Sequence, residues 1–205
     1  GSYLIPAVMM IIIFQTLLMV IGMVTGEEYS SDGIRTYAPF GHTWAAAIRI
    51  VAGKAFVYCG LYAIFSFFLL GLLPYFFSIP NIGNGLYIVL LMIPYLIATS
   101  FLGLAASRYF TDSEAPLLMI AFFSVGLIFL SGVSYPMELM PWYWKAAHYI
   151  LPAAPATLAF VQLNSMGASM ADIRPEYITL WIQVLVYFIL SIWVYQKKLQ
   201  KSQLR

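Results

Sequence analysis

The feature that constrains this chain most is a long stretch without charge. No Asp, Glu, Lys or Arg occurs from Ala55 to Ser107, and turn-forming residues between Ser78 and Gly85 divide the stretch into two apolar segments. Each segment is long enough to cross a bilayer as an α-helix. Charged residues make up 9% of the 205 residues, which is too few to cover the surface of a soluble fold. The sequence therefore predicts an all-α integral membrane protein.

Hydropathy predicts five transmembrane helices in a single transmembrane domain over residues 1–205. The expected spans cover residues 3–26, 55–77, 86–107, 115–135 and 177–196. A further apolar run, Tyr149 to Leu163, is short and contains Pro152 and Pro155. Runs of that length are more often re-entrant or interfacial than spanning. We therefore expect a re-entrant element over residues 136–163, before the last span.

The distribution of basic residues predicts an orientation. Cytoplasmic loops of membrane proteins are enriched in Lys and Arg. Five spans place eight of the ten basic residues on one side of the membrane, namely Arg35, Arg49, Lys54, Arg108, Lys197, Lys198, Lys201 and Arg205. A sixth crossing would move the basic C-terminal tail to the other side. The first residue is therefore expected outside and the C-terminus in the cytoplasm.

The loop between the first two spans carries most of the polar sequence. Glu27 and Glu28 lie at the expected membrane surface, and residues 42–54 are predicted to form an amphipathic helix. His42 and Arg49 share its polar face, and its apolar face is formed by Trp44, Ala45, Ile48, Val51 and Ala52. The pattern fits a helix that anchors the bundle at the cytoplasmic surface equally well as one that docks a partner.

Four prolines interrupt the stretch from Ser131 to Leu163, namely Pro136, Pro141, Pro152 and Pro155. Irregular backbone at membrane depth is tolerated only where protein or a water-filled cavity satisfies its polar groups. The stretch is therefore expected to form either a gate on a substrate path or an outer cap. Gln15, in the middle of the first span, is expected to face such a path or to bond to a neighbouring helix.

Several function classes are disfavoured by missing residues. No expected span contains Asp, Glu, Lys, Arg or His, which ion-coupled carriers normally keep inside the membrane. Gly53-Lys54 lacks the first glycine and the Ser or Thr of a nucleotide-binding loop. The two histidines, His42 and His148, are far apart in sequence, and Cys59 is the only cysteine. We expect no catalytic residues, no metal site and no cofactor bound by this chain.

Three segments, in this order, resemble the type-2 ATP-binding-cassette exporter permeases. They are the series Glu27-Glu28, Gly33, Pro39 and Gly53-Lys54, the stretch from Leu130 to Pro141, and the turn Pro152-Ala153-Ala154-Pro155. The resemblance covers nearly the whole chain. It implies that the five spans correspond to spans two to six of the family, and that the first span and the extracellular domain are missing here.

The resemblance also implies a function, namely export of amphipathic or hydrophobic cargo of the drug, lipid or glycan class across a bacterial inner membrane. A separate ATPase subunit would bind ATP and Mg²⁺, and two permease halves would pair. The residues expected to couple to the ATPase are Glu27, Glu28, Arg35, His42, Arg49 and Lys54. Cargo is expected near Phe14, Gln15, Phe123 and Phe129, and the re-entrant gate at Pro136, Pro141, Pro152 and Pro155.

Two other classes remain as alternatives at this point. The chain could be a membrane subunit that passes ATPase-driven movement to an extracellular domain, or a membrane scaffold. A membrane-embedded enzyme ranks last, because the spans offer almost no clustered polar groups. The net charge of +2 gives no indication of a nucleic-acid partner.

Overall fold

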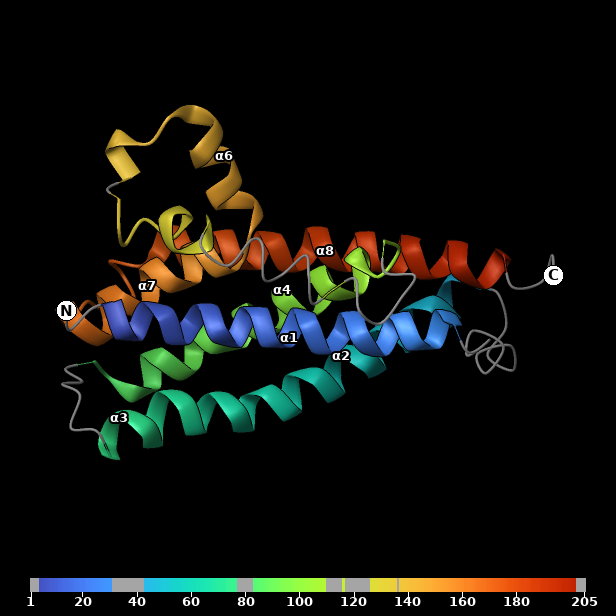
Figure 1. Cartoon of the computed structure of the whole chain (residues 1–205), viewed down its shortest axis with the longest axis horizontal. Coiled ribbons are helices and arrows are strands. Elements are labelled where there is room, and N and C mark those ends of the chain that lie inside the picture. Colours follow the sequence, from blue (N-terminus) through green and yellow to red (C-terminus); the bar gives the residue numbers. More distant parts are fainter. Residues whose placement is uncertain are drawn as a thin grey trace.

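The structure is a computed structural model that describes residues 4–30, 43–76, 83–109, 116, 126–135 and 137–201. Its elements are α1 (Leu4–Ser30), α2 (Trp44–Phe67), the π-helical turn η2 (Phe68–Leu72), α3 (Leu73–Phe76), α4 (Gly85–Ala106), the 3₁₀ turn η3 (Met137–Leu139), α6 (Trp142–Ile150), α7 (Ala153–Met166) and α8 (Arg174–Lys201). Every described element is a helix, and the long helices run side by side (Figure 1). The predicted all-α class is confirmed.

Four helical segments among the described residues are long and apolar enough to cross a membrane. They are Leu4–Glu28, Trp44–Phe76, Gly85–Ala106 and Arg174–Gln200. They correspond to the first, second, third and last spans expected from the sequence. The expected span over residues 115–135 lies mostly outside the described residues, although residues 126–130 are helical. The chain is a multi-pass membrane protein.

The helix that contains the second span begins earlier than the sequence predicted, and at 33 residues (Trp44–Phe76) it is longer than a bilayer crossing requires. We expected a separate interfacial helix over residues 42–54, but α2 starts at Trp44 and passes through Lys54 without a break. The Thr43 side chain caps it by accepting a hydrogen bond from the Ala46 N–H at 3.3 Å. The only residue between Trp44 and Lys54 that weakens a helix is Gly53, and one glycine costs only about 1 kcal/mol.

The buried face of this part of α2 also differs from the expected apolar face. Ala46, Ala47 and Val51 pack inside the bundle, whereas Trp44 and Ile48 are exposed. Small side chains allow membrane helices to approach closely, and large apolar side chains are well solvated by lipid. Of the five residues of the expected apolar face only Val51 is buried, because hydrophobicity alone does not distinguish a side chain that packs inside the bundle from one on its outside.

Helix α4 lies at the centre and packs against α1, α2, α7 and α8. The small residues Thr99 and Gly103 and the C-cap Ser107 are buried and recur every four residues, which suits a face for close helix packing. A Cβ atom on Gly103 would lie 2.9 Å from Cδ1 of Ile21, so α1 approaches α4 closely there. Further along, the fully buried Tyr95 hydroxyl donates a hydrogen bond of 2.7 Å to the Met10 carbonyl.

Helices α6 and α7 form the expected re-entrant element. They meet at an angle of 86°. The 14 residues of α7 span about 21 Å, which is less than the roughly 30 Å of a hydrocarbon core, and α6 turns away from the bundle instead of completing the crossing (Figure 1). Pro152 and Pro155 start α7 rather than break it, since the N–H groups of a first turn have no helical partner.

Gly167 ends α7 in the left-handed conformation, with φ 65° and ψ 27°. The next N–H, of Ala168, donates to the Gln162 carbonyl at 3.1 Å and so satisfies one of the last carbonyls of the helix. Replacing Gly167 by alanine is expected to lower the unfolding free energy by about 1 kcal/mol.

A glycine in regular helical conformation provides the control for Gly167→Ala. Gly53 is in the interior of α2 with nothing within 4 Å of an added Cβ, so Gly53→Ala is expected to be neutral or stabilising. Thermal unfolding in mild detergent measures both changes. A Gly167→Ala protein as stable as the Gly53→Ala protein would show that the cap does not set the end of α7.

Candidate functional site

An ion pair joins α1 and α2 at the end of the bundle where α1 finishes. The Lys54 ammonium lies 2.7 Å from Oε1 and 2.5 Å from Oε2 of Glu28. The two side chains are only 14% and 27% exposed. Water therefore screens this pair less than a surface pair, and the hydrogen bonds to both carboxylate oxygens are charge-assisted. The pair holds the end of one span against the next.

Helix α8 completes this arrangement. Lys54 also donates to the hydroxyl of Tyr195 at 3.3 Å, and Tyr195 is buried. The ammonium groups of Lys54 and Lys198 lie 5.3 Å and 5.1 Å from the centre of the Tyr195 ring. Lys198 donates to Oγ of Ser107 at 2.9 Å and to its carbonyl at 3.4 Å. A cation at these last carbonyls of α4 is favoured by the helix dipole.

We call Glu28, Lys54, Ser107, Tyr195 and Lys198 the charged junction. It connects the ends of α1, α4 and α8 with the first half of α2. At this level α2 is therefore connected to α1 and α8 directly, and to α4 through Lys198 of α8.

The charged junction contains two of the six residues predicted to couple to an ATPase, Glu28 and Lys54. Glu27 is exposed at the same end of α1, and Arg49 is exposed on α2, five residues before Lys54. Arg35 and His42 lie outside the described residues. These residues were expected on a surface, and nothing in the sequence indicated that Glu28 and Lys54 contact one another.

The other three members of the junction, Ser107, Tyr195 and Lys198, were not predicted to lie at this site. Tyr195 was not singled out from the sequence, and Lys198 was expected only among the basic residues on the cytoplasmic side. Their partners lie 141 and 91 residues away along the chain. The one available signal was topological, since five spans place the ends of α1, α4 and α8 on the same side of the membrane.

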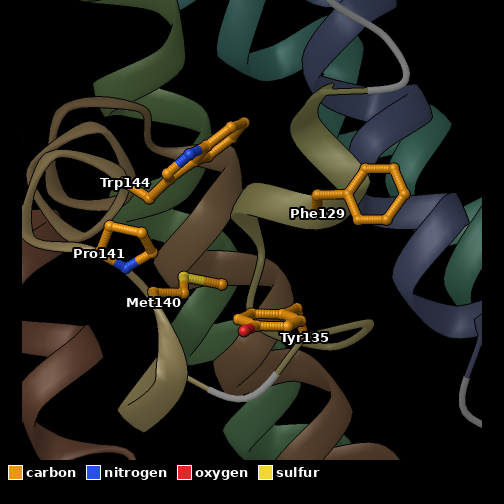
Figure 2. Close-up of a pocket in the computed structure, with 5 residues that line it drawn as sticks. All are labelled: Phe129, Tyr135, Met140, Pro141 and Trp144. Atoms are coloured by element: carbon orange, nitrogen blue, oxygen red, sulfur yellow. The ribbon is translucent and has the colours of Figure 1, made fainter.

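A second site is a largely apolar cavity of about 330 Å³ beside α6. It is lined by Phe129, Tyr135, Met140, Pro141 and Trp144, and Figure 2 shows these side chains arranged around it. Phe129 was predicted to contact cargo and Pro141 to form part of a gate, so the structure brings one residue of each set together. Three aromatic rings around an opening suit an amphipathic ligand, which presents an apolar surface with a polar end.

The other residues predicted for the cargo path and the gate lie elsewhere. Phe14 is 3% exposed and belongs to the hydrophobic core, and Gln15 is half-buried on the same helix. Pro152 and Pro155 are buried at the start of α7. Phe123 and Pro136 lie outside the described residues.

The C-terminal end of α6 is held by hydrogen bonds to residues outside the re-entrant pair. On α8, the Gln183 amide donates to the Tyr149 carbonyl at 2.7 Å, and the Tyr187 hydroxyl donates to the Ile150 carbonyl. His148 is buried, and its Nδ1 donates to the Leu130 carbonyl at 2.7 Å. The last carbonyls of a helix lack helical partners, so α8 satisfies two groups that would be costly to bury.

Removing one of these donors tests whether its hydrogen bond to the end of α6 stabilises the fold. Tyr187→Phe is expected to lower the unfolding free energy by about 1 kcal/mol, because it leaves the Ile150 carbonyl without this donor. The matched control is Tyr75→Phe, since Tyr75 is 81% exposed. Unfolding by denaturant in detergent compares the two, and equal stabilities would exclude a structural role for the Tyr187 hydroxyl.

Comparison with known proteins agrees with the family to which the motifs pointed. A family model described as ABC-2 family transporter protein matches residues 1–193, nearly the whole chain. No curated protein and no solved structure matches it. With the multi-pass helical bundle, the re-entrant pair and the matched residues in agreement, the chain belongs to the ABC-2 family of transporter permeases.

Proposed function

We propose that this chain is the membrane half of an ATP-driven exporter for amphipathic cargo. The observation that carries the proposal is the charged junction, in which one ion pair and one buried tyrosine join α2 to the ends of α1 and α8. The family resemblance supports a separate ATPase that binds ATP and Mg²⁺ and docks near Arg35 to Lys54. It also supports a second permease half.

In this proposal α2 carries the movement. The helix is continuous from Trp44 to Phe67, so a displacement imposed on its first turn moves Lys54 with it. Lys54 then shifts α1 through Glu28 and α8 through Tyr195. An ATPase can drive such a change only if it binds the two arrangements of the bundle with different free energies. The exposed Arg49, near the first turn, is the described side chain best placed for that contact.

The charges support an orientation in which the junction lies at the cytoplasmic face. This end carries Arg49, Lys54, Arg108, Lys197 and Lys198, whereas the far end of α8 begins at Arg174. Cytoplasmic loops are enriched in such residues. The cavity beside α6 then lies toward the outer face, because α6 is held at Gln183 and Tyr187, in the first half of α8.

The test exchanges the charge at the proposed docking position. In the full-length permease expressed with its ATPase, Arg49→Glu is expected to reduce co-purification of the ATPase and its hydrolysis of ATP. The control, Lys145→Glu, introduces the same charge change on α6, away from the junction, and is expected to have no effect. Unchanged co-purification and hydrolysis with Arg49→Glu would contradict docking at this helix. Hydrolysis that responds to no amphipathic compound would favour the mechanical alternative.

A further inference from the structure

Two basic side chains that are far apart in sequence share one indole ring. The Lys197 ammonium lies 3.7 Å from the centre of the Trp193 ring, and the Arg108 guanidinium carbon lies 5.8 Å from it. Arg108 is the second residue after the end of α4, whereas Trp193 and Lys197 are one turn apart on α8. Contacts between a cation and an aromatic face hold both charges near the same point.

The positive charge at this point is not neutralised within the described part of the chain. Neither Arg108 nor Lys197 forms an ion pair with a described residue, and both side chains are exposed. The next acidic residues along the chain, Asp112 and Glu114, lie outside the described residues. Two cations on the outside of the bundle favour an anionic ligand between them.

An apolar stripe on α8 leads directly to this pair of charges. Ile182, Val186 and Ile189 are 55%, 46% and 66% exposed, and their spacing places them on the same helix face as Trp193. From Ile182 to Trp193 the helix rises about 16 Å, close to half of a hydrocarbon core of roughly 30 Å. The stripe therefore matches the acyl chains of one leaflet, and Trp193 lies at the level of the headgroups.

We propose that Arg108, Trp193 and Lys197 form a binding site for a phospholipid with an anionic headgroup. Its phosphodiester lies between the guanidinium and the ammonium, and its acyl chains lie along the stripe. A zwitterionic lipid binds less well, because its own ammonium group is repelled by the same two cations. The adjacent Lys198 belongs to the charged junction. This lipid therefore contacts α8, one of the helices that the junction connects.

Quenching of Trp193 fluorescence by brominated lipids measures the preference directly. The full chain, with the other four tryptophans replaced by phenylalanine, is placed in vesicles that mix phosphatidylcholine with either brominated phosphatidylglycerol or brominated phosphatidylcholine. Phosphatidylglycerol is expected to bind more tightly. Arg108→Gln and Lys197→Gln should each reduce that preference about fivefold, and raised salt should reduce it as well.

Arg174→Gln provides the matched control, because Arg174 is exposed at the opposite end of α8. It is expected to leave the lipid preference at Trp193 unchanged. Native mass spectrometry of the protein with all its tryptophans, counting retained phosphatidylglycerol, gives a second reading if the phenylalanine background fails to fold. An unchanged preference in the Arg108→Gln, Lys197→Gln double variant would overturn the proposal, as would equal quenching by the two brominated lipids.

Discussion

Replacing Lys54 by methionine is expected to lower the unfolding free energy of the bundle by about 3 kcal/mol. The change removes the ammonium that contacts both carboxylate oxygens of Glu28, and it also removes the donor to Tyr195. Breaking a buried ion pair on one side costs about 3–5 kcal/mol, and the lower end applies here because Glu28 is 27% exposed. Unfolding by denaturant in mild detergent measures the loss.

A double variant separates the free energy of the ion pair from the other effects of removing the lysine side chain. Glu28→Gln combined with Lys54→Met is expected to cost less than the sum of the two single changes, because the second change removes a charge that the first left uncompensated. Arg49→Met provides the control, since Arg49 is exposed on the same helix and its loss should cost at most about 0.5 kcal/mol in the isolated protein. Equal losses from Lys54→Met and Arg49→Met would remove the basis for the charged junction.

Replacing Gly103 by leucine is expected to separate α1 from α4 and to cost about 3 kcal/mol or more. A Cβ at this position would already lie 2.9 Å from Cδ1 and 3.2 Å from Cβ of Ile21, and a leucine adds three further carbons. Gly103→Ala is expected to cost about 1–2 kcal/mol, because part of the Ile21 side chain can move aside. The same unfolding assay ranks the two variants.

Two further variants determine whether the loss arises from this contact. Gly60→Leu, on α2, adds the same side chain where nothing lies within 4 Å, and it is expected to be neutral or stabilising. Ile21→Ala in the Gly103→Leu background opens space and should recover part of the lost stability. A Gly103→Leu protein that is as stable as the Gly60→Leu protein would contradict the close approach of α1 and α4.

Much of the fold was predictable because lipid imposes a simple rule on sequence. The first expected span, residues 3–26, corresponds to a helix at Leu4–Ser30, and the last, residues 177–196, to one at Arg174–Lys201. The re-entrant pair followed from the length of an apolar run and its prolines. The start of α2 was not predictable in the same way. Polar residues near a membrane surface can belong to a separate helix or to the continuation of a spanning helix, and hydropathy does not distinguish the two.

The contacts of the charged junction could not be predicted from hydropathy. Glu28 and Lys54 were identified through a family motif, yet their contact depends on two chain segments that approach only after folding. Tyr195 lies 141 residues from Lys54, and a single sequence contains no measure of such distances. Likewise, the family resemblance led us to expect Phe14 near cargo, whereas in the bundle it is 3% exposed and belongs to the hydrophobic core.

Labelling from one face of the membrane determines on which side each end of the bundle lies. In a chain with Cys59→Ala, single cysteines are introduced at the exposed positions Arg49, Lys197 and Leu139 and treated with a membrane-impermeant maleimide in intact cells and in inverted vesicles. We expect the cysteines at 49 and 197 to react only in inverted vesicles and the cysteine at 139 only in intact cells. Reaction of positions 49 and 197 from opposite faces would contradict the bundle, its orientation and the proposed coupling.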